Sequence, residues 1–262
     1  MDYVIISAVA LVVSGLTFFS GFGLGTLLMP AFALFFPIEI AVAATAIVHL
    51  ANNIFKLFLI GKYAVMRIVL KFAVPAAIAA VFGAMVLNYI SDLEALGSYT
   101  IGGKEFFIMP VKLIIAVLMI IFALAELLPF INDFNIKEKY IPVGGVLSGF
   151  FGGVSGHQGA LRTAFLVHAG LEKKALIGTM VTSSVIVDIS RLIVYGITFF
   201  SVHFTVMKSG NISSLIMVGM IAAFIGAFIG RQLLEKVTLK HIQITVAVML
   251  LLLSVGLASG II

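Results

Sequence analysis

Long apolar segments fill this sequence from end to end, and they restrict its fold more than any other feature. The segments cover residues 5–20, 23–36, 38–60, 68–90, 109–130, 141–153, 158–170, 174–200, 211–231 and 241–260. A helix of about 20 apolar residues crosses the hydrocarbon core of a bilayer and satisfies its own backbone there. Only 10% of the residues are charged, too few to solvate a globular surface. We therefore predict an all-α integral membrane protein, in which the longest polar stretch, 91–107, is a loop.

The composition also argues against several classes of function. The chain has no cysteine, which excludes disulfides and thiolate metal sites, and its five histidines are too scattered to form an obvious metal site. It contains neither a P-loop nor an HExxH or GxSxG motif. Basic residues in cytoplasmic loops explain the net charge of +5 better than nucleic-acid binding does. We expect no metal, no cofactor, no catalytic residue and no nucleic-acid partner.

The sequence contains a weak internal repeat. Residues 14–16 reappear as 148–150, and the Gly-rich run 21–25 falls opposite 155–159, at a constant offset of 134. After one inserted residue the match continues, with Asn53, Lys56 and Gly61 opposite Asp188, Arg191 and Gly196. Internal duplication is a common plan in transporters. We therefore divide the chain into an N-terminal membrane repeat, 1–135, and a C-terminal membrane repeat, 136–262.

The distribution of lysine and arginine predicts how the repeats cross the membrane. If the first two segments of each repeat form one span, the two faces tie at six basic residues each. If each such pair enters and returns to the same side, one face carries ten basic residues: Lys62, Arg67, Lys71, Lys137, Lys139, Lys173, Lys174, Arg231, Lys236 and Lys240. The other face carries only Lys104 and Lys208, or also Lys112 at a helix mouth. Basic loops favour the cytoplasm, so the second arrangement is preferred.

This arrangement defines the predicted fold. Each repeat holds a Gly-broken or re-entrant helical pair followed by three transmembrane helices. An odd number of full spans gives the two repeats inverted topology. Both termini of this multi-pass protein are then predicted on the non-cytoplasmic side of the cell inner membrane.

Glycines interrupt the first apolar pair of each repeat. They are Gly21, Gly23 and Gly25 in the first repeat, and Gly152, Gly153, Gly156 and Gly159 in the second. Glycine permits positive φ and close backbone approach, and freed backbone groups are tolerated at membrane depth only inside protein or beside water. We predict that the breaks meet near the midplane and that the helices restarting there bind an anion through their N-termini. The alternative is close helix packing through small residues.

The second break is the more polar one. Its candidate substrate-binding residues are Ser155, Gly156, His157, Gln158, Gly159, Arg162 and Thr163. A charge near the bilayer centre costs roughly 2.5–3.5 kcal/mol, so intramembrane charges usually serve function. We interpret Arg162 as a counter-charge for a bound anion, with snorkelling to the cytoplasmic surface as the alternative. His157 either binds the anion, titrates near neutral pH, or is a structural histidine bonded to backbone.

Two long segments supply further candidates. In 174–200, Thr182 and Ser183 donate either to a substrate or back to helix carbonyls. Asp188 and Arg191 are neighbours on one helix face, so they form either a neutral pair or a coupling site at which Asp188 accepts a proton.

The matching segment of the first repeat, 38–60, places His49 and Asn53 deep enough to line a cavity. Lys56 lies four residues from the end of this segment, where a lysine side chain can snorkel to the surface.

The two glycine motifs resemble those of the TauE/SafE sulfite exporter family. Residues 14–30 carry Ser-Gly-Leu and then Gly-Phe-Gly-Leu-Gly-Thr-Leu-Leu-Met-Pro, and residues 148–159 read Ser-Gly-Phe-Phe-Gly-Gly-Val-Ser-Gly-His-Gln-Gly. The second copy departs from the family pattern, because His157 and Gln158 stand where small residues are common and Ala164 stands opposite Pro30. The resemblance implies a duplicated membrane unit that transports sulfite, sulfonates or related small organic or inorganic anions.

We therefore predict a secondary transporter of a small anion that works by alternating access in the lipid bilayer. The coupling ion is a proton or Na⁺, and the candidate coupling residues are His157, Asp188 and Arg191. Two alternatives stay open, namely a passive anion channel and a membrane-embedded enzyme or assembly factor. A channel needs the same polar midplane site, whereas the third class lacks any recognisable catalytic constellation.

Overall fold

The computed structural model describes residues 2–16, 24–127, 137–202, 212–232 and 239–261. The first half contains α1 (Asp2–Leu16), α2 (Leu24–Ala33), α3 (Ile38–Ile60), η1 (Gly61–Tyr63), α4 (Met66–Ser91) and α5 (Pro110–Leu127). The second contains η3 (Glu138–Tyr140), α6 (Ile141–Ser155), α7 (Gly159–Leu166), η4 (Val167–Ala169), α8 (Lys173–Val202), α10 (Ile212–Gln232) and α11 (Leu239–Ala258). The predicted helical fold is confirmed.

Four helices within the described part of the chain, α3, α4, α8 and α10, are long and apolar enough to cross a membrane. Their outer surfaces are apolar as well. On α4 the exposed side chains recur every three or four residues and include Leu70, Val74, Ile78, Phe82 and Met85. Such a stripe on the outside suits lipid rather than water, so the bundle is that of a membrane protein.

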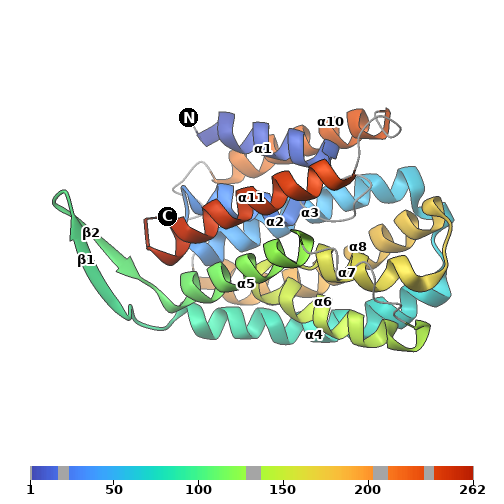
Figure 1. The fold of residues 1–262 in the computed structure, drawn as a ribbon, viewed down its shortest axis with the longest axis horizontal. Helices are drawn as coiled ribbons and strands as arrows, with labels where there is room; N and C mark the ends of the chain where they lie inside the picture. Colours follow the sequence, from blue (N-terminus) through green and yellow to red (C-terminus); the bar gives the residue numbers. More distant parts are fainter. Residues whose placement is uncertain (1, 17–23, 128–136, 203–211, 233–238, 262) are drawn as a thin grey trace.

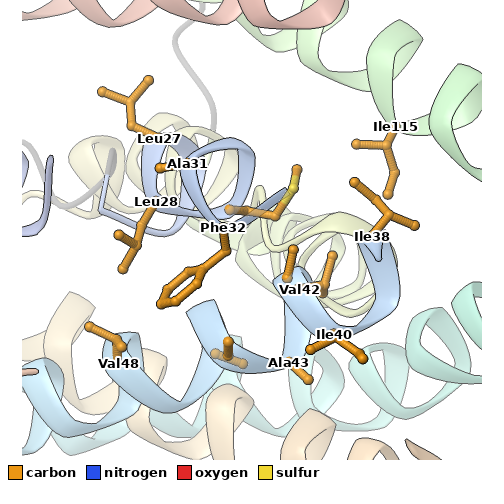
Figure 2. Packing of buried hydrophobic residues seen from close by; sticks show 14 of the residues in the cluster. Leu27, Leu28, Ala31, Phe32, Ile38, Ile40, Val42, Ala43, Val48 and Ile115 are labelled. Carbon is orange, nitrogen blue, oxygen red and sulfur yellow. The ribbon is translucent and has the colours of Figure 1, made fainter. Parts of the chain in front are cut away.

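Two helices are too short to cross a bilayer. At 1.5 Å per residue, α2 with 10 residues and α7 with 8 span roughly half of the hydrocarbon core. Every residue of α2 from Leu24 to Phe32 is buried. Figure 2 shows the reason, because Leu28 and Phe32 of α2 point toward α3 and pack near Val42 and Val48. This short helix therefore lies inside the protein.

The helix contacts of the two halves match one another. If α1–α5 are aligned with α6, α7, α8, α10 and α11, the contact of α4 with α6 corresponds to that of α10 with α1. The contact of α4 with α8 likewise corresponds to that of α10 with α3, and α3–α8 and α5–α11 pair across the centre. The end of α3 contacts the start of α8 through Gly178, and the end of α11 contacts the start of α5 through the hairpin and Gly260. These aligned pairs run antiparallel, as Figure 1 shows.

Glycines bring two pairs of helices into close contact. On α6, Gly145, Gly149 and Gly153 recur every four residues and lie against backbone carbonyls of α4. On α10, Gly226 and Gly230 lie against the backbone of α1 in the same way. A Cβ at any of the five would overlap the facing helix, so these small residues act as packing sites. For Gly153, the packing alternative is the one that the structure shows.

The loop predicted over 91–107 contains a β-hairpin instead. Strands β1 (Gly97–Ile101) and β2 (Lys104–Ile108) pair antiparallel, and the hairpin projects from the end of the bundle that holds both chain termini (Figure 1). The turn residues Gly102 and Gly103 have φ of 59° and 79°, values that glycine adopts without strain. A Gly-Gly pair between two strands indicates a hairpin. The two strands have only five residues each, so their alternating pattern is hard to recognise in the sequence.

Basic side chains gather at the opposite end of the bundle. Lys62 and Lys174 lie over the ring of Tyr63, at 5.2 and 5.7 Å from its centroid. Lys71 donates to the carboxylate of Glu138 at 2.6 Å, and this hydrogen bond holds the pKa of Glu138 below its usual range. The two ends of the bundle therefore differ in charge.

Candidate functional site

The second glycine break is present, between α6 and α7. Helix α6 ends at Ser155, Gly156 adopts a left-handed conformation with φ of 81°, and α7 begins at Gly159. The carbonyl of Gln158 accepts a hydrogen bond from the Ser148 hydroxyl at 2.8 Å, which ties the break back to α6. Glycine is the residue that adopts this φ without strain, so the break depends on Gly156.

The start of α2, which follows the first glycine-rich segment, contacts the second break. Gly21 and Gly23 lie outside the described residues, but Gly25 stands in the first turn of α2. A Cβ on Gly25 would lie 3.2 Å from the carbonyl oxygen of Gly156 and 3.6 Å from the His49 ring. The start of α2 therefore meets the α6–α7 break beside His49, inside the bundle.

The carboxylate of Asp188 lies beside this contact and collects hydrogen bonds from three parts of the fold. Its Oδ1 accepts from Gln158 Nε2 at 2.8 Å and from Arg191 Nη2 at 2.7 Å. Its Oδ2 lies 2.7 Å from His49 Nδ1 and accepts from Asn53 Nδ2 at 3.2 Å. All five side chains are buried. We call His49, Asn53, Gln158, Asp188 and Arg191 the Asp188 cluster.

The carboxylate of Asp188 determines which nitrogen of His49 carries a hydrogen. An ionised carboxylate only accepts hydrogen bonds, so His49 presents an Nδ1–H to Asp188. Arg191 and Asp188 form the pair that their spacing predicts, but His49 shares the same carboxylate. The pair is thus part of a network that joins α3, α8 and the second break.

Two hydrogen bonds to α6 hold α8 in place. Arg191 Nη1 donates to the carbonyl of Gly152 at 3.0 Å, and the Tyr195 hydroxyl donates to that of Gly153. Both side chains are fully buried. Tyr195 is absent from the residues singled out by the sequence, although it lies one turn beyond Arg191 on the same helix face.

Arg162 and Lys56 are both buried, with 2% and 5% of their surfaces exposed. The snorkelling alternative therefore fails for each of them. Arg162 lies within electrostatic range of Asp188 and Arg191, and Lys56 within range of Arg162. With its amide oxygen turned toward the ammonium, Asn52 accepts from Lys56 Nζ at 3.3 Å. Burial of Lys56 and the role of Asn52 are not evident from the sequence.

One ring nitrogen of His157 faces its own backbone, and the buried Nε2 has no hydrogen-bond partner among the described residues. Its Nδ1 lies 3.0 Å from both the carbonyl and the hydroxyl oxygen of Ser155. Its ring stacks on Phe122 of α5, with the centroids 5.7 Å apart and the planes at 4°. The imidazole thus packs on α5 and contacts its own backbone. The side chain of Gln158, the next residue, instead donates to Asp188.

The predicted hydroxyl ligands differ in their bonding. Thr182 donates to the carbonyl of Gly178 at 2.8 Å, and Ser155 donates to that of Phe151 at 3.0 Å. The buried hydroxyl of Ser183 has no hydrogen-bond partner among the described residues. Thr163 is half-buried on α7. Ser183 therefore keeps a donor that a ligand could use, whereas Thr182 and Ser155 bond back to their helix.

A cavity opens near the end of the bundle that holds the termini. Its volume is about 280 Å³, and its lining residues are Ala33, Phe35, Phe36, Pro37, Ile38, Lys112 and Leu257. They come from the α2–α3 turn, the start of α5 and the end of α11. The side chains that line it are apolar except for that of Lys112.

Comparison with known proteins gives a family match. The family model for the sulfite exporter TauE/SafE matches residues 5–257, nearly the whole chain. No curated protein and no solved structure matches the chain. The matched range includes both glycine breaks and the whole Asp188 cluster, so the resemblance seen in the glycine motifs is confirmed.

Proposed function

The chain belongs to the sulfite exporter TauE/SafE family, and on this premise we propose that it is a secondary transporter of a small sulfur-containing anion. Sulfite, a sulfonate or a related anion would bind where the two glycine breaks meet. The observation that carries this proposal is the contact of Gly25 with Gly156 beside His49 and Arg191 of the Asp188 cluster, which lies within electrostatic range of the buried Arg162. Broken helices that meet inside a membrane bundle are typical of transport sites.

The architecture supports alternating access between inverted repeats, 1–135 and 136–262. The matched contacts of the two halves, and the antiparallel course of α3 against α8, suit two units of opposite orientation. The seams α4–α6 and α1–α10 each join helices from different halves through close glycine contacts. We expect each seam to move as one body, so that the anion site opens first to one side and then to the other.

Burial of the site favours a transporter over a passive channel. The residues His49, Asp188, Arg191 and Arg162 are each less than one-tenth exposed. An anion bound among them is therefore shielded from both aqueous phases in this conformation. Release then requires a conformational change, which a carrier undergoes in every cycle.

The charge at the two ends supports an orientation in the cell inner membrane. Lys62, Lys71 and Lys174 lie at one end, and the hairpin and both termini at the other. We propose that the basic end faces the cytoplasm. The cavity beside Lys112 would then face outward.

The His49–Asp188 pair suits proton coupling. The two groups lie 2.7 Å apart, on helices of different halves. Imidazole is the side chain that changes charge most readily near neutral pH, and chains of His and carboxylate groups serve as proton relays in transporters. We prefer a proton to Na⁺ as the coupling ion for this reason.

Flux measurements test the transport proposal. We would reconstitute purified protein into liposomes and follow labelled sulfite and labelled methanesulfonate, with Arg162→Ala beside wild type. Arg67→Ala is a matched control, because Arg67 is three-quarters exposed at the basic end. We expect wild type and the control to transport and Arg162→Ala to lose most of its flux. Unchanged flux in Arg162→Ala would remove Arg162 as an anion ligand, and a large conductance in planar bilayers would favour the channel.

A further inference from the structure

Two lysines from different halves of the chain converge on one aromatic ring at the basic end of the bundle. The ammonium groups of Lys62, in η1, and Lys174, in the first turn of α8, lie 5.2 and 5.7 Å from the centroid of the Tyr63 ring. A tyrosine ring attracts a cation placed over its face, so this side chain draws both lysines to one place. The packing of Gly178 of α8 against the carbonyl of Ile60 brings the two segments together (Figure 1).

This pair of lysines differs from other basic residues at the same end in having no carboxylate partner. Lys71 and Arg67 both lie within ion-pair distance of Glu138, at 2.6 and 3.5 Å. Within the described part of the chain, neither Lys62 nor Lys174 forms an ion pair with a carboxylate. Two ammonium groups within 6 Å of one centroid repel each other, and an anion held between them would be attracted by both.

An exposed apolar surface adjoins the two lysines. Phe58, four residues before Lys62 on the membrane-spanning helix α3, is 86% exposed, and Ile54 continues the outward side of this helix one turn further. Tyr63 and Met66 are exposed as well. Exposed apolar side chains on a membrane-spanning helix face acyl chains, and tyrosine is typical of the membrane–water interface. The two ammonium groups therefore lie where the hydrocarbon of the bilayer gives way to lipid head groups.

We propose that Lys62 and Lys174 bind the phosphate head group of an anionic phospholipid, with one acyl chain of this lipid along Phe58. Ammonium groups form strong, charge-assisted hydrogen bonds with phosphate oxygens, and basic pockets between membrane helices bind such head groups. Phe58 favours a lipid over a free anion such as inorganic phosphate, which has no apolar part to cover this side chain. Because the two lysines belong to different halves, the lipid joins the end of α3 to the start of α8. The site is separate from the proposed anion site and does not depend on which anion is transported.

Dioleoyl phosphatidylglycerol and dioleoyl phosphatidylcholine provide a matched pair of probes, because they share their acyl chains and differ in net charge. Native mass spectrometry of the full chain, purified in an uncharged detergent, measures the dissociation constant of each lipid. For wild type we expect phosphatidylglycerol to bind at least about tenfold more tightly, since each basic side chain near a lipid phosphate contributes about fivefold. The double variant Lys62→Gln, Lys174→Gln should lose this preference and keep its affinity for phosphatidylcholine within about twofold. Glycerol 3-phosphate, which lacks acyl chains, should not displace the bound lipid.

Two further variants serve as controls. Lys71→Gln alters a lysine at the same end of the bundle that pairs with Glu138, and it should keep the preference for phosphatidylglycerol. The double variant Lys62→Arg, Lys174→Arg keeps both charges and should retain most of the preference, which separates loss of charge from loss of folding. Equal affinities of wild type for the two lipids, or an unchanged preference in the double glutamine variant, would overturn the inference. Displacement of the lipid by glycerol 3-phosphate would overturn it too, because the site would then bind a free anion.

Discussion

At the scale of single residues, Asp188 decides how the site holds together. It is fully buried, and its two oxygens accept hydrogen bonds from three elements. Removal of one partner from a buried ion pair leaves the other charge uncompensated, which usually costs more than removal of both. The interaction between Asp188 and Arg191 is therefore open to a double-mutant test.

We expect Asp188→Asn to lower the free energy of unfolding by about 3–5 kcal/mol, because Arg191 then lacks its counter-charge. The double variant Asp188→Asn, Arg191→Gln should be less destabilised than either single variant. Unfolding by titration of SDS into mixed micelles measures all three free energies. Additive losses in the double variant would show that the two side chains do not depend on each other.

Gly156 gives a second prediction at this scale. Its φ of 81° is strained for any residue with a Cβ, so Gly156→Ala should cost about 1–2 kcal/mol. Gly97→Ala is the control, since nothing lies within 4 Å of a Cβ placed there and its effect should stay within about 0.5 kcal/mol. Equal stability of the two variants would mean that the break tolerates a side chain and does not require glycine.

Much of the residue list can be derived from the sequence, because polar side chains inside apolar segments are rare. Arg162, Asp188 and Arg191 stand out for this reason. The pairing of His49 with Asp188 cannot be derived in that way, since 139 residues separate them. Lys56 shows a different limit. Its distance from the segment end suits snorkelling equally well, and its burial becomes evident only in the folded bundle, where α3 packs against α2, α8 and α10.

At the scale of helices, the glycines of α6 and its C-terminus have two structural roles. Gly156 ends α6, whereas Gly145, Gly149 and Gly153 bring α6 onto α4. The sequence shows both sets as one glycine-rich region and does not separate them. The difference appears only when α4 is placed alongside, because a Cβ at Gly149 would then overlap the carbonyl of Ala76.

This contact predicts that Gly149→Val separates α6 from α4. We expect the variant to lose about 1–3 kcal/mol of stability, the usual cost of overpacking a tight contact. Val143→Ala on the exposed face of α6 provides a comparison and should change stability little. The same SDS titration applies, and a fully stable Gly149→Val variant would contradict the close approach of these helices.

At the scale of the whole molecule, the two halves share one pattern of contacts, and the basic and hairpin ends are distinct. The number of segments and the pairing of short with long helices follow from hydropathy and glycine positions. The mutual packing of α1 with α10 and of α4 with α6 does not, because both contacts join residues far apart in the chain.

The proposed orientation leads to a labelling prediction. The native chain has no cysteine, so single cysteines report without background. A cysteine at Lys104, in the hairpin, should react with a membrane-impermeant maleimide in intact cells. A cysteine at Lys139, at the basic end, should react only after the cells are permeabilised. The reverse pattern would place both termini in the cytoplasm and invert the proposed topology.

The claim on which the function depends is that an anion binds where the two glycine breaks meet, with Arg162 as its counter-charge. Equilibrium binding of labelled sulfite to purified protein tests it without any assumption about coupling or direction. We expect saturable binding to wild type and to Arg67→Gln, and an affinity lowered at least about tenfold in a folded Arg162→Gln variant. Wild-type affinity in Arg162→Gln would contradict the account and place the anion elsewhere.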